Sequence, residues 1–370
     1  MRSLLLCSCV VLGACTGLVG GEPSDAAVDS PDAAVVERDA GAAGDAGVPG
    51  DDAGSGAFDA GTPDAGVDAG PSLTGRVVFA IGGQDMRHLV SFDGGTWEHD
   101  TYVAPNGEDN AFSGVAVGKG GIVMSGDPGI YRSTDGVGWT LVQTRPSRFS
   151  FHGSVMGFGG GQFVMVAQDQ GWRSGDGLTW ESKQDTAGQA GHWHALAFGN
   201  GRWVALGDLI RKVSDNGLDW HDPTPFAADL FTDVAWGNGR FVAVGKENND
   251  GWVAASTDGL TWAKTATVPT PYQTGLASIS FGNGVFVTST CCSTLSSPDG
   301  VTWTTIANNG AGGKIVFGGD RFVSSGWRTQ ANVLTPDAGH WVNTFGGDQP
   351  KLYDDAGIAP WFTAVGAGEL

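Results

Sequence analysis

The heptapeptide Ser174-Gly175-Asp176-Gly177-Leu178-Thr179-Trp180 decides the fold, because its pattern, Ser-x-Asp/Asn-Gly-x-x-Trp, returns along the whole chain. Clear copies begin at Ser91, Ser133, Ser174, Ser214, Ser256 and Ser297, and a degenerate seventh, TPDAGHW, begins at Thr335. The closing tryptophans recur about every 41 residues, which is the length of one supersecondary unit in a repeat protein. The sequence therefore predicts seven copies of one structural unit.

A second signature lies about twenty residues before each heptapeptide and marks a hairpin. It reads AFGNGRWVA at 197–205, with relatives at 235–243 and 280–288. Asn-Gly between two apolar runs favours a two-residue turn in which both central residues have positive φ. Each unit then has four strands: one before this Gly-turn, one after it, a third ending at the heptapeptide serine, and a fourth starting at its tryptophan.

Units of this kind predict an all-β protein, a seven-bladed β-propeller of four-stranded antiparallel blades over residues 73–370, with no helices. The innermost strands alternate large and small apolar residues, as in Met156-Gly157-Phe158. We expect the bulky side of one blade to pack against the small side of the next.

The heptapeptide resembles the Asp-box, or BNR repeat, of sialidase-like propellers, and the resemblance covers residues 77–366. It departs from the usual Asp-box, which has one more residue between the Asp and the aromatic. Each acid or amide is expected to accept hydrogen bonds from the amides of its own turn, and each tryptophan to be buried at the blade edge. These structural residues are Asp93, Trp97, Asp135, Trp139, Asp176, Trp180, Asn216, Trp220, Asp258, Trp262, Asp299, Trp303, Asp337 and Trp341.

The two chain ends are expected to share a blade. Arg76–Gly82 has the pattern of a second strand, so the first blade lacks an innermost strand near the N-terminus. We expect Tyr353–Ala359 to supply it. Phe362–Val365 then competes with Val77–Ile81 for the second position, and the sequence does not decide between them.

The N-terminal sequence MRSLLLCSCVVLGAC predicts a secretory signal at residues 1–14. Its last four residues resemble the lipobox of bacterial lipoproteins, which implies lipidation at Cys15 and a place in the outer membrane, periplasmic or surface-exposed. An ordinary secretory signal is the alternative. The rest of 15–72 is rich in Asp, Ala, Gly and Pro, so we expect a disordered tether.

Composition excludes one class of partner. The net charge is −20, with 20 Lys and Arg against 40 Asp and Glu, so a nucleic-acid backbone would be repelled. We expect no cofactor and no metal, and a monomer anchored to the membrane through lipid.

The face opposite the Gly-turns and heptapeptides carries the variable connections, where function usually resides. The ligand-binding residues predicted at the channel mouth on this face are His152, His192, His194 and Asp233, with Trp193, Tyr272 and Trp327 as stacking surfaces for a sugar. A metal or general-base role for the histidines is the alternative. Cys291 and Cys292 are predicted to form a vicinal disulfide, although adjacent cysteines make a strained one.

These features favour a noncatalytic, surface-tethered recognition propeller that binds a glycan, peptide or partner protein. The first alternative is a sialidase-like glycoside hydrolase or lyase, which would need an arginine cluster and a tyrosine nucleophile. The arginines that follow the Gly-turns, Arg202, Arg240 and Arg321, are expected on the structural face instead. The second alternative is an envelope scaffold protein.

Overall fold

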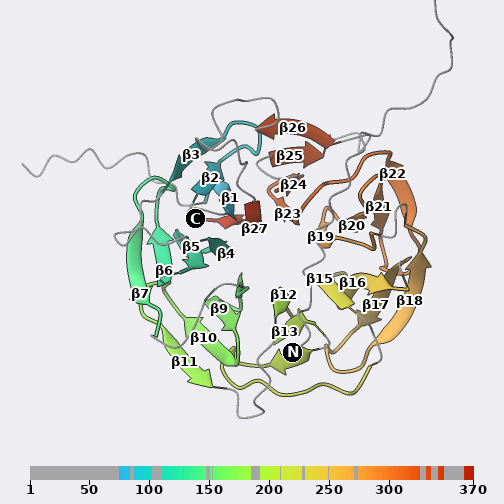
Figure 1. Ribbon diagram of the computed structural model, residues 1–370, viewed down its shortest axis with the longest axis horizontal. Helices are drawn as coiled ribbons and strands as arrows, with labels where there is room; N and C mark the ends of the chain where they lie inside the picture. The colour runs from blue at the N-terminus through green and yellow to red at the C-terminus, as the bar shows by residue number, and fades with distance from the viewer. Residues whose placement is uncertain are drawn as a thin grey trace, which may run out of the picture. The chain divides into compact units, whose positions relative to one another are not determined.

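The structure, a computed structural model, describes residues 75–83, 87–101, 111–127, 129–146, 151, 153–184, 192–208, 210–226, 230–248, 250–270, 274–325, 331–334, 341–345 and 362–370. All regular elements in these ranges are strands, and none of the described residues forms a helix that could span a membrane. The strands make seven antiparallel sheets around a common centre within the unit Pro71–Leu370 (Figure 1). The predicted seven-bladed β-propeller is confirmed.

Each sheet is one blade, and its strands run outward from the centre in chain order except in blade 1. Blades 1 to 3 contain β27 (Phe362–Glu369), β1 (Val77–Gly83), β2 (Arg87–Ser91) and β3 (Glu98–Thr101); β4 (Phe112–Gly118), β5 (Gly121–Gly126), β6 (Gly129–Ser133) and β7 (Thr140–Thr144); and β8 (Val155–Gly159), β9 (Gln162–Ala167), β10 (Gln170–Ser174) and β11 (Glu181–Gln184). Blades 4 and 5 contain β12 (Trp193–Gly199), β13 (Arg202–Gly207) and β14 (Arg211–Ser214); and β15 (Leu230–Gly237), β16 (Arg240–Glu247), β17 (Asp250–Ser256) and β18 (Ala263–Val268). Blades 6 and 7 contain β19 (Ser278–Gly282), β20 (Val285–Ser289), β21 (Thr294–Ser297) and β22 (Thr304–Ala307); and β23 (Ile315–Gly318), β24 (Arg321–Ser324), β25 (Ala331–Leu334) and β26 (Trp341–Phe345).

Blade 4 departs from the predicted four strands. Its outer edge is reduced to a single bridge between Val213 and His221. Pro223 and Pro225 follow directly, and proline has no backbone N–H to donate to a strand ladder. The fourth strand therefore does not form within the described residues of this blade.

The Gly-turns have the predicted conformation. Asn200 and Gly201 have φ of 49° and 74°, and the equivalent pairs in blades 2, 3, 5 and 6 are also positive at both positions. The turns join β12 to β13 and the corresponding strands of the other blades in tight register, with Gly199 opposite Arg202. Type I′ geometry thus fixes where the innermost strand ends in blades 2 to 6.

The heptapeptide turns are held by their own side chains. Asp176 Oδ1 accepts hydrogen bonds from the amides of Leu178 at 2.8 Å and Thr179 at 2.9 Å, while Ser174 Oγ accepts from the Gly177 amide at 2.8 Å. The same bonds recur in the copies with Asp93, Asp135, Asn216, Asp258 and Asp299. Backbone bonds hold the pKa of Asp93 at about 2, chiefly the one from Thr96. Asp337 lies outside the described residues.

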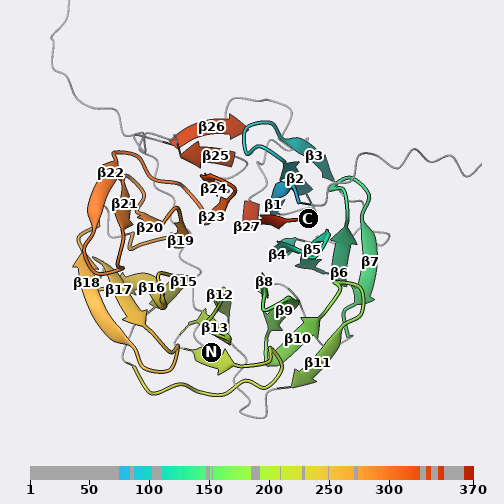
Figure 2. The same ribbon diagram turned by 180° about the vertical axis from the view of Figure 1, so that it is seen from behind.

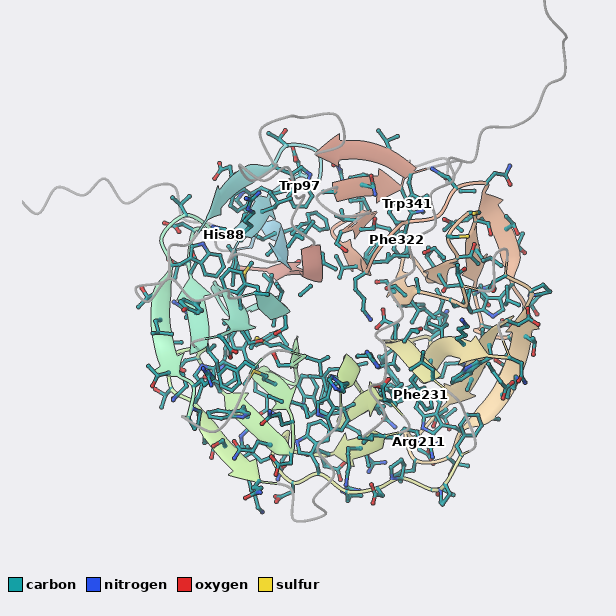
Figure 3. All side chains as sticks on the ribbon, viewed as in Figure 1. His88, Trp97, Arg211, Phe231, Phe322 and Trp341 are labelled. Carbon is teal, nitrogen blue, oxygen red and sulfur yellow. The ribbon has the colours of Figure 1, made fainter. Side chains whose placement is uncertain are left out.

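Each of blades 2 to 6 interlocks with the next blade through the glycine that ends its innermost strand. A methyl group at Gly118, Gly159, Gly199, Gly237 or Gly282 would overlap the aromatic ring of the next blade, which is Phe158, Phe198, Trp236, Phe281 or Phe317 respectively. Further along the strand, small Ala116 packs with bulky Met156 of the next blade, as expected. Side chains fill the remaining space between sheets, and Figure 3 labels Arg211 beside Phe231 between blades 4 and 5, where its guanidinium lies 5.7 Å from the ring centre.

Ring closure differs from the sequence expectation. The innermost strand of blade 1 is β27, which pairs antiparallel with β1 from Val77 opposite Glu369 to Ile81 opposite Val365, and both views place it at the centre (Figures 1 and 2). Val77–Ile81 therefore fills the second position and Phe362–Val365 the first, so the two do not compete. Gly366 and Gly368 allow this placement, because a methyl group there would overlap the backbone of β4 at Val115 and Val117. Tyr353–Ala359 lies outside the described residues.

Candidate functional site: the channel mouth on the loop face

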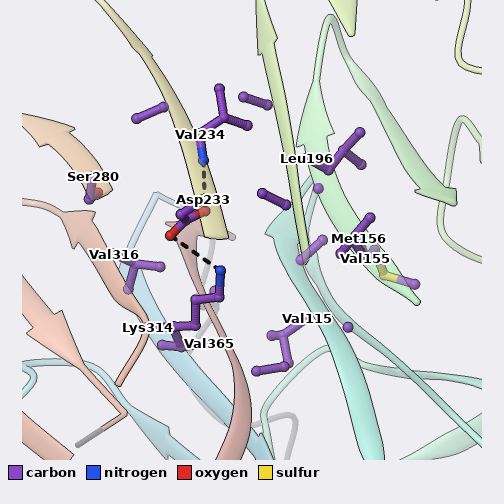
Figure 4. A pocket seen from close by; sticks show the side chains of 18 of the residues that line it. Val115, Val155, Met156, Leu196, Asp233, Val234, Ser280, Lys314, Val316 and Val365 are labelled. Atoms are coloured by element: carbon purple, nitrogen blue, oxygen red, sulfur yellow. Dashed lines mark hydrogen bonds and ion pairs between the residues drawn. The ribbon is translucent and has the colours of Figure 1, made fainter. Parts of the chain in front are cut away.

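The innermost strands of all seven blades surround a cavity of about 360 Å³. Most of the side chains that line it are apolar, among them Val115, Met156, Leu196, Val316 and Val365 (Figure 4), although polar atoms contribute more of its accessible surface than apolar atoms do. We call the end where these strands begin the loop face, and the end that carries the Gly-turns and heptapeptides the turn face. Polar groups in this cavity gather where β12, β15 and β23 begin.

Polar groups on the turn face form hydrogen bonds that link neighbouring blades. Three arginines there donate to a heptapeptide carbonyl of the next blade: Arg202 to Asp258 O at 2.8 Å, Arg240 to Asp299 O at 3.1 Å and Arg321 to Asp93 O at 2.6 Å. Hydrogen bonding to Asp215 raises the pKa of Arg202 further above its ordinary value. These three guanidinium groups therefore lie on the structural face, as predicted, and act as links between blades.

Lys314 is the centre of the polar cluster at the loop face. It lies immediately before β23 in blade 7, yet its Nζ donates to the carbonyl oxygens of His194 in blade 4 at 3.0 Å and Thr232 in blade 5 at 2.7 Å. The same Nζ is 3.4 Å from Asp233 Oδ2 (Figure 4). One lysine side chain thus reaches past blade 6 to two other blades.

Asp233 is held in place independently of this lysine. Its Oδ2 accepts from Ser278 Oγ at 2.5 Å and from the Ile279 amide at 3.1 Å, and its Oδ1 accepts from the Val234 amide at 2.9 Å. Its side chain is only 13% exposed. The carboxylate therefore has a fixed position, with both oxygens accepting hydrogen bonds.

Two β-bulges orient the backbone at this site. The pairing of β12 with β13 shifts between Trp193 and Ala195, and that of β15 with β16 shifts between Phe231 and Asp233. The extra residues are His194 and Thr232, whose carbonyls receive Lys314. A bulged residue leaves the regular ladder, so its carbonyl is available to a group outside the sheet.

The predicted site residues are only partly brought together. His194 and Asp233 line the same cavity, but His194 Nε2 pairs with Asp208 Oδ1 at 2.6 Å and meets Asp233 only through Lys314. The bulge also interrupts the regular strand alternation at His194, and the His192 side chain is exposed. Among the described residues, no group of three His, Cys, Asp or Glu side chains is close enough to hold a metal ion.

The aromatic surfaces predicted for sugar stacking do not gain support. Trp193 is 6% exposed, packs with Val164, Val166 and Trp203, and donates its indole N–H to Gln168 O at 2.8 Å. Its ring is therefore part of the core between blades 3 and 4. His152, Tyr272 and Trp327 lie outside the described residues, as does Cys15.

Sequence reasoning missed Lys314, although the repeats contained the signal. When the blades are aligned on the large apolar residue before the Gly-turn, the position three residues earlier is Gly114, Val155 or Ala195 in blades 2 to 4 and Asp233, Ser278 or Lys314 in blades 5 to 7. At this position, three consecutive blades carry a polar residue where the other three carry glycine or an apolar residue. The pattern marks blades 5 to 7 as different from the rest of the ring. Nearby on the same face, Cys291 and Cys292 occupy a turn in blade 6 with their Sγ atoms 2.7 Å apart.

Comparison with solved structures finds proteins with a similar fold. A structure of YCF48 bound to D1 peptide matches with a TM-score of 0.51 at 16% identity, covering 70% of this chain and 89% of that one. A putative 6-phosphogluconolactonase from Bacteroides uniformis matches with a TM-score of 0.54 at 11% identity, covering 80% and 100%. The fold is shared. At these identities the likeness shows no more than that, and no protein-family model and no curated protein match the chain.

Proposed function

We propose that the protein is a noncatalytic binding propeller that recognises a peptide segment at the loop-face end of its channel. The observation that carries this proposal is the cluster of Lys314, Asp233 and the two bulge carbonyls at the mouth of an apolar cavity. Concave, mostly apolar sites with a few fixed polar groups are typical of ligand binding. The peptide bound by the structurally similar YCF48 supports this class of ligand over a glycan, which is the second choice.

The state of the polar groups favours binding over catalysis. Both oxygens of the Asp233 carboxylate already accept hydrogen bonds, and the Lys314 ammonium already donates to two carbonyls and pairs with Asp233. A general base or a nucleophile needs an atom open to the substrate. Tyr131 is fully buried, while the other three tyrosines, Tyr102, Tyr272 and Tyr353, lie outside the described residues. The sialidase-like hydrolase therefore gains no support from the described site.

The remaining parts of the proposal come from the sequence. We propose that the heptapeptides are variants of the Asp-box, that residues 1–14 are removed, and that Cys15 carries lipid in the outer membrane, with 15–72 as a spacer. Replacing Cys15 by serine should then abolish lipid labelling and release a monomeric protein from membranes. A serine variant that still fractionates with membranes would contradict the lipid anchor.

Peptide recognition can be tested by selection from a displayed peptide library and, in parallel, on a glycan array, with the full chain as bait. Variants on the two faces provide the matched comparison: His192→Arg on the loop face, and Val137→Arg, at a residue 62% exposed on the turn face. Peptides that lose binding with the first variant and keep it with the second would support the proposal. Binding lost only with the Val137 variant, or glycan binding without any peptide binding, would contradict it.

A further inference from the structure

The Lys314 ammonium occupies a cradle of three oxygen acceptors: His194 O at 3.0 Å, Thr232 O at 2.7 Å and Asp233 Oδ2 at 3.4 Å. An ammonium group has three N–H donors and one positive charge. Lys314 donates hydrogen bonds to the two carbonyls, and the Asp233 carboxylate forms an ion pair with the same ammonium. The cradle therefore suits a primary ammonium group in the type of acceptor it offers and in the sign of its charge.

The cradle does not depend on Lys314 for its shape. The two carbonyls belong to β-bulges in β12 and β15, whose strands are fixed by pairing with β13 and β16. Asp233 keeps its three other donors, Ser278 Oγ and the amides of Val234 and Ile279, whether or not the lysine is present. Removing the ammonium should therefore leave the oxygens in place.

The ammonium group of Lys314 can leave the cradle without disturbing blade 7, because the residue is anchored in that blade through its backbone. Its amide donates to Ser325 Oγ at 3.1 Å and its carbonyl accepts from the Ser325 amide at 3.0 Å, while four rotatable bonds connect this anchor to Nζ. The side chain is 31% exposed at the channel mouth, so its charged end can reach water. When the ammonium group of a ligand takes the place of this one, the contacts with the cradle stay the same. The affinity then depends on the contacts that the rest of the ligand makes.

We propose that His194 O, Thr232 O and Asp233 Oδ2 form a binding site for a primary ammonium group, which Lys314 fills in the unliganded protein and which a lysine side chain of a bound peptide takes over. This inference rests on the proposed function and names its ligand chemistry. The apolar wall, including Val316 and Val365, suits the aliphatic stem of such a side chain. A net charge of −20 also favours a cationic partner.

The test supplies, as a free molecule, the part of the Lys314 side chain that substitution by alanine removes. Lys314→Ala deletes three methylene carbons and the ammonium nitrogen, so propylammonium restores the missing atoms. We expect the alanine variant to bind propylammonium with a Kd of about 1–10 mM, since four heavy atoms supply only a limited affinity. The wild-type protein should bind it at least about tenfold more weakly, because its tethered lysine competes. Titration followed by NMR and by thermal melting measures both.

Controls separate the cradle from general effects of salt or of apolar solutes. Tetramethylammonium has the charge without N–H groups, and 1-propanol has the chain without the charge, so neither should raise the melting temperature of the alanine variant. Lys314→Met fills the same volume and should not respond to propylammonium. Adding Asp233→Asn to the alanine variant should weaken binding severalfold.

A specific response of Lys314→Ala to propylammonium would support the site, whether or not any peptide is found by library selection. Equal binding by wild type and the alanine variant, or equal effects of propylammonium and tetramethylammonium, would overturn it and leave the broader binding function to its own test. If the alanine variant does not fold in plain buffer, refolding yields in the two salts give the same comparison: recovery only with propylammonium supports the cradle, and equal yields contradict it.

Discussion

Replacing Gly199 by alanine places a methyl group inside the space occupied by the Trp236 indole of the next blade. Gly199 does not have a positive φ, so alanine suits its backbone and gains about 0.4–1 kcal/mol by restricting the unfolded chain. Forcing a methyl group into a packed interface costs about 1–3 kcal/mol. We therefore expect a net loss of about 1–2 kcal/mol in the free energy of unfolding.

For the unit Pro71–Leu370 the entropy of unfolding is roughly 0.6 kcal/mol/K, so the melting temperature should fall by about 2–3 °C. Calorimetry and urea denaturation measure the change. Gly175→Ala is the matched control, because a methyl group at Gly175 meets nothing within 4 Å. It should leave stability unchanged or raise it slightly.

A double-mutant cycle with Trp236→Ala then isolates the contact. Once the indole is removed, Gly199→Ala should become neutral or stabilising, which gives a coupling free energy of at least about 1 kcal/mol. Additive effects of the two substitutions would refute the idea that a ring of glycine–aromatic contacts joins the blades.

Three further predictions concern the stability of the protein at low pH, the closure of the propeller ring and the oxidation state of Cys291 and Cys292. The folded-state pKa of Asp93 is lowered from 3.8 to about 2, so its contribution to stability is present above pH 4 and is lost between about pH 4 and 2. The urea midpoint of the protein should therefore fall over this pH range, and it should fall less in the Asp93→Asn variant. The same dependence on pH in both proteins would contradict the hydrogen-bond argument. Deleting Phe362–Leu370 should expose the edge of β1 and cause aggregation, measured by light scattering, whereas a monomer with unchanged melting would count against closure by β27. Cys291 and Cys292 remain predicted to form a vicinal disulfide under oxidising conditions, so intact mass should show the loss of two hydrogens, reversed by a thiol reductant; persistent labelling of both thiols would exclude it.

The fold could be predicted because its determinants are local and repeated. Each of the six heptapeptides that the structure describes closes its own turn with hydrogen bonds within four residues, and each Asn-Gly pair forms a hairpin turn from its own backbone conformation. Seven copies make the same prediction seven times. Blade 4 is the exception, since Pro223 and Pro225 remove a strand that the repeat alone would assign.

The closing strand could not be assigned so easily. Phe362–Glu369 pairs with β1, which is nearly three hundred residues away in the chain, and its glycines are explained only by the approach of β4. Tyr353–Ala359 and Phe362–Val365 look equally like strands when each is considered by itself. The decision between them depends on contacts that no local pattern records.

The candidate site was only half predicted for a similar reason. Asp233 and His194 were chosen because they lie near the start of innermost strands, but the bulges at His194 and Thr232 have no clear sequence signature. Lys314 contacts residues 82 and 120 positions away. Only alignment of the repeats, which sets Asp233, Ser278 and Lys314 side by side, points to it.

Hydrogen exchange of backbone amides, with and without the tightest peptide obtained from a library, tests the central claim most directly. Binding at the loop-face mouth predicts slower exchange where β12, β15 and β23 begin, around His194, Asp233 and Ile315, with the Gly-turns unchanged. Protection confined to the Gly-turns and heptapeptides would contradict the account, because it would place the ligand on the face whose groups are committed to holding the blades together.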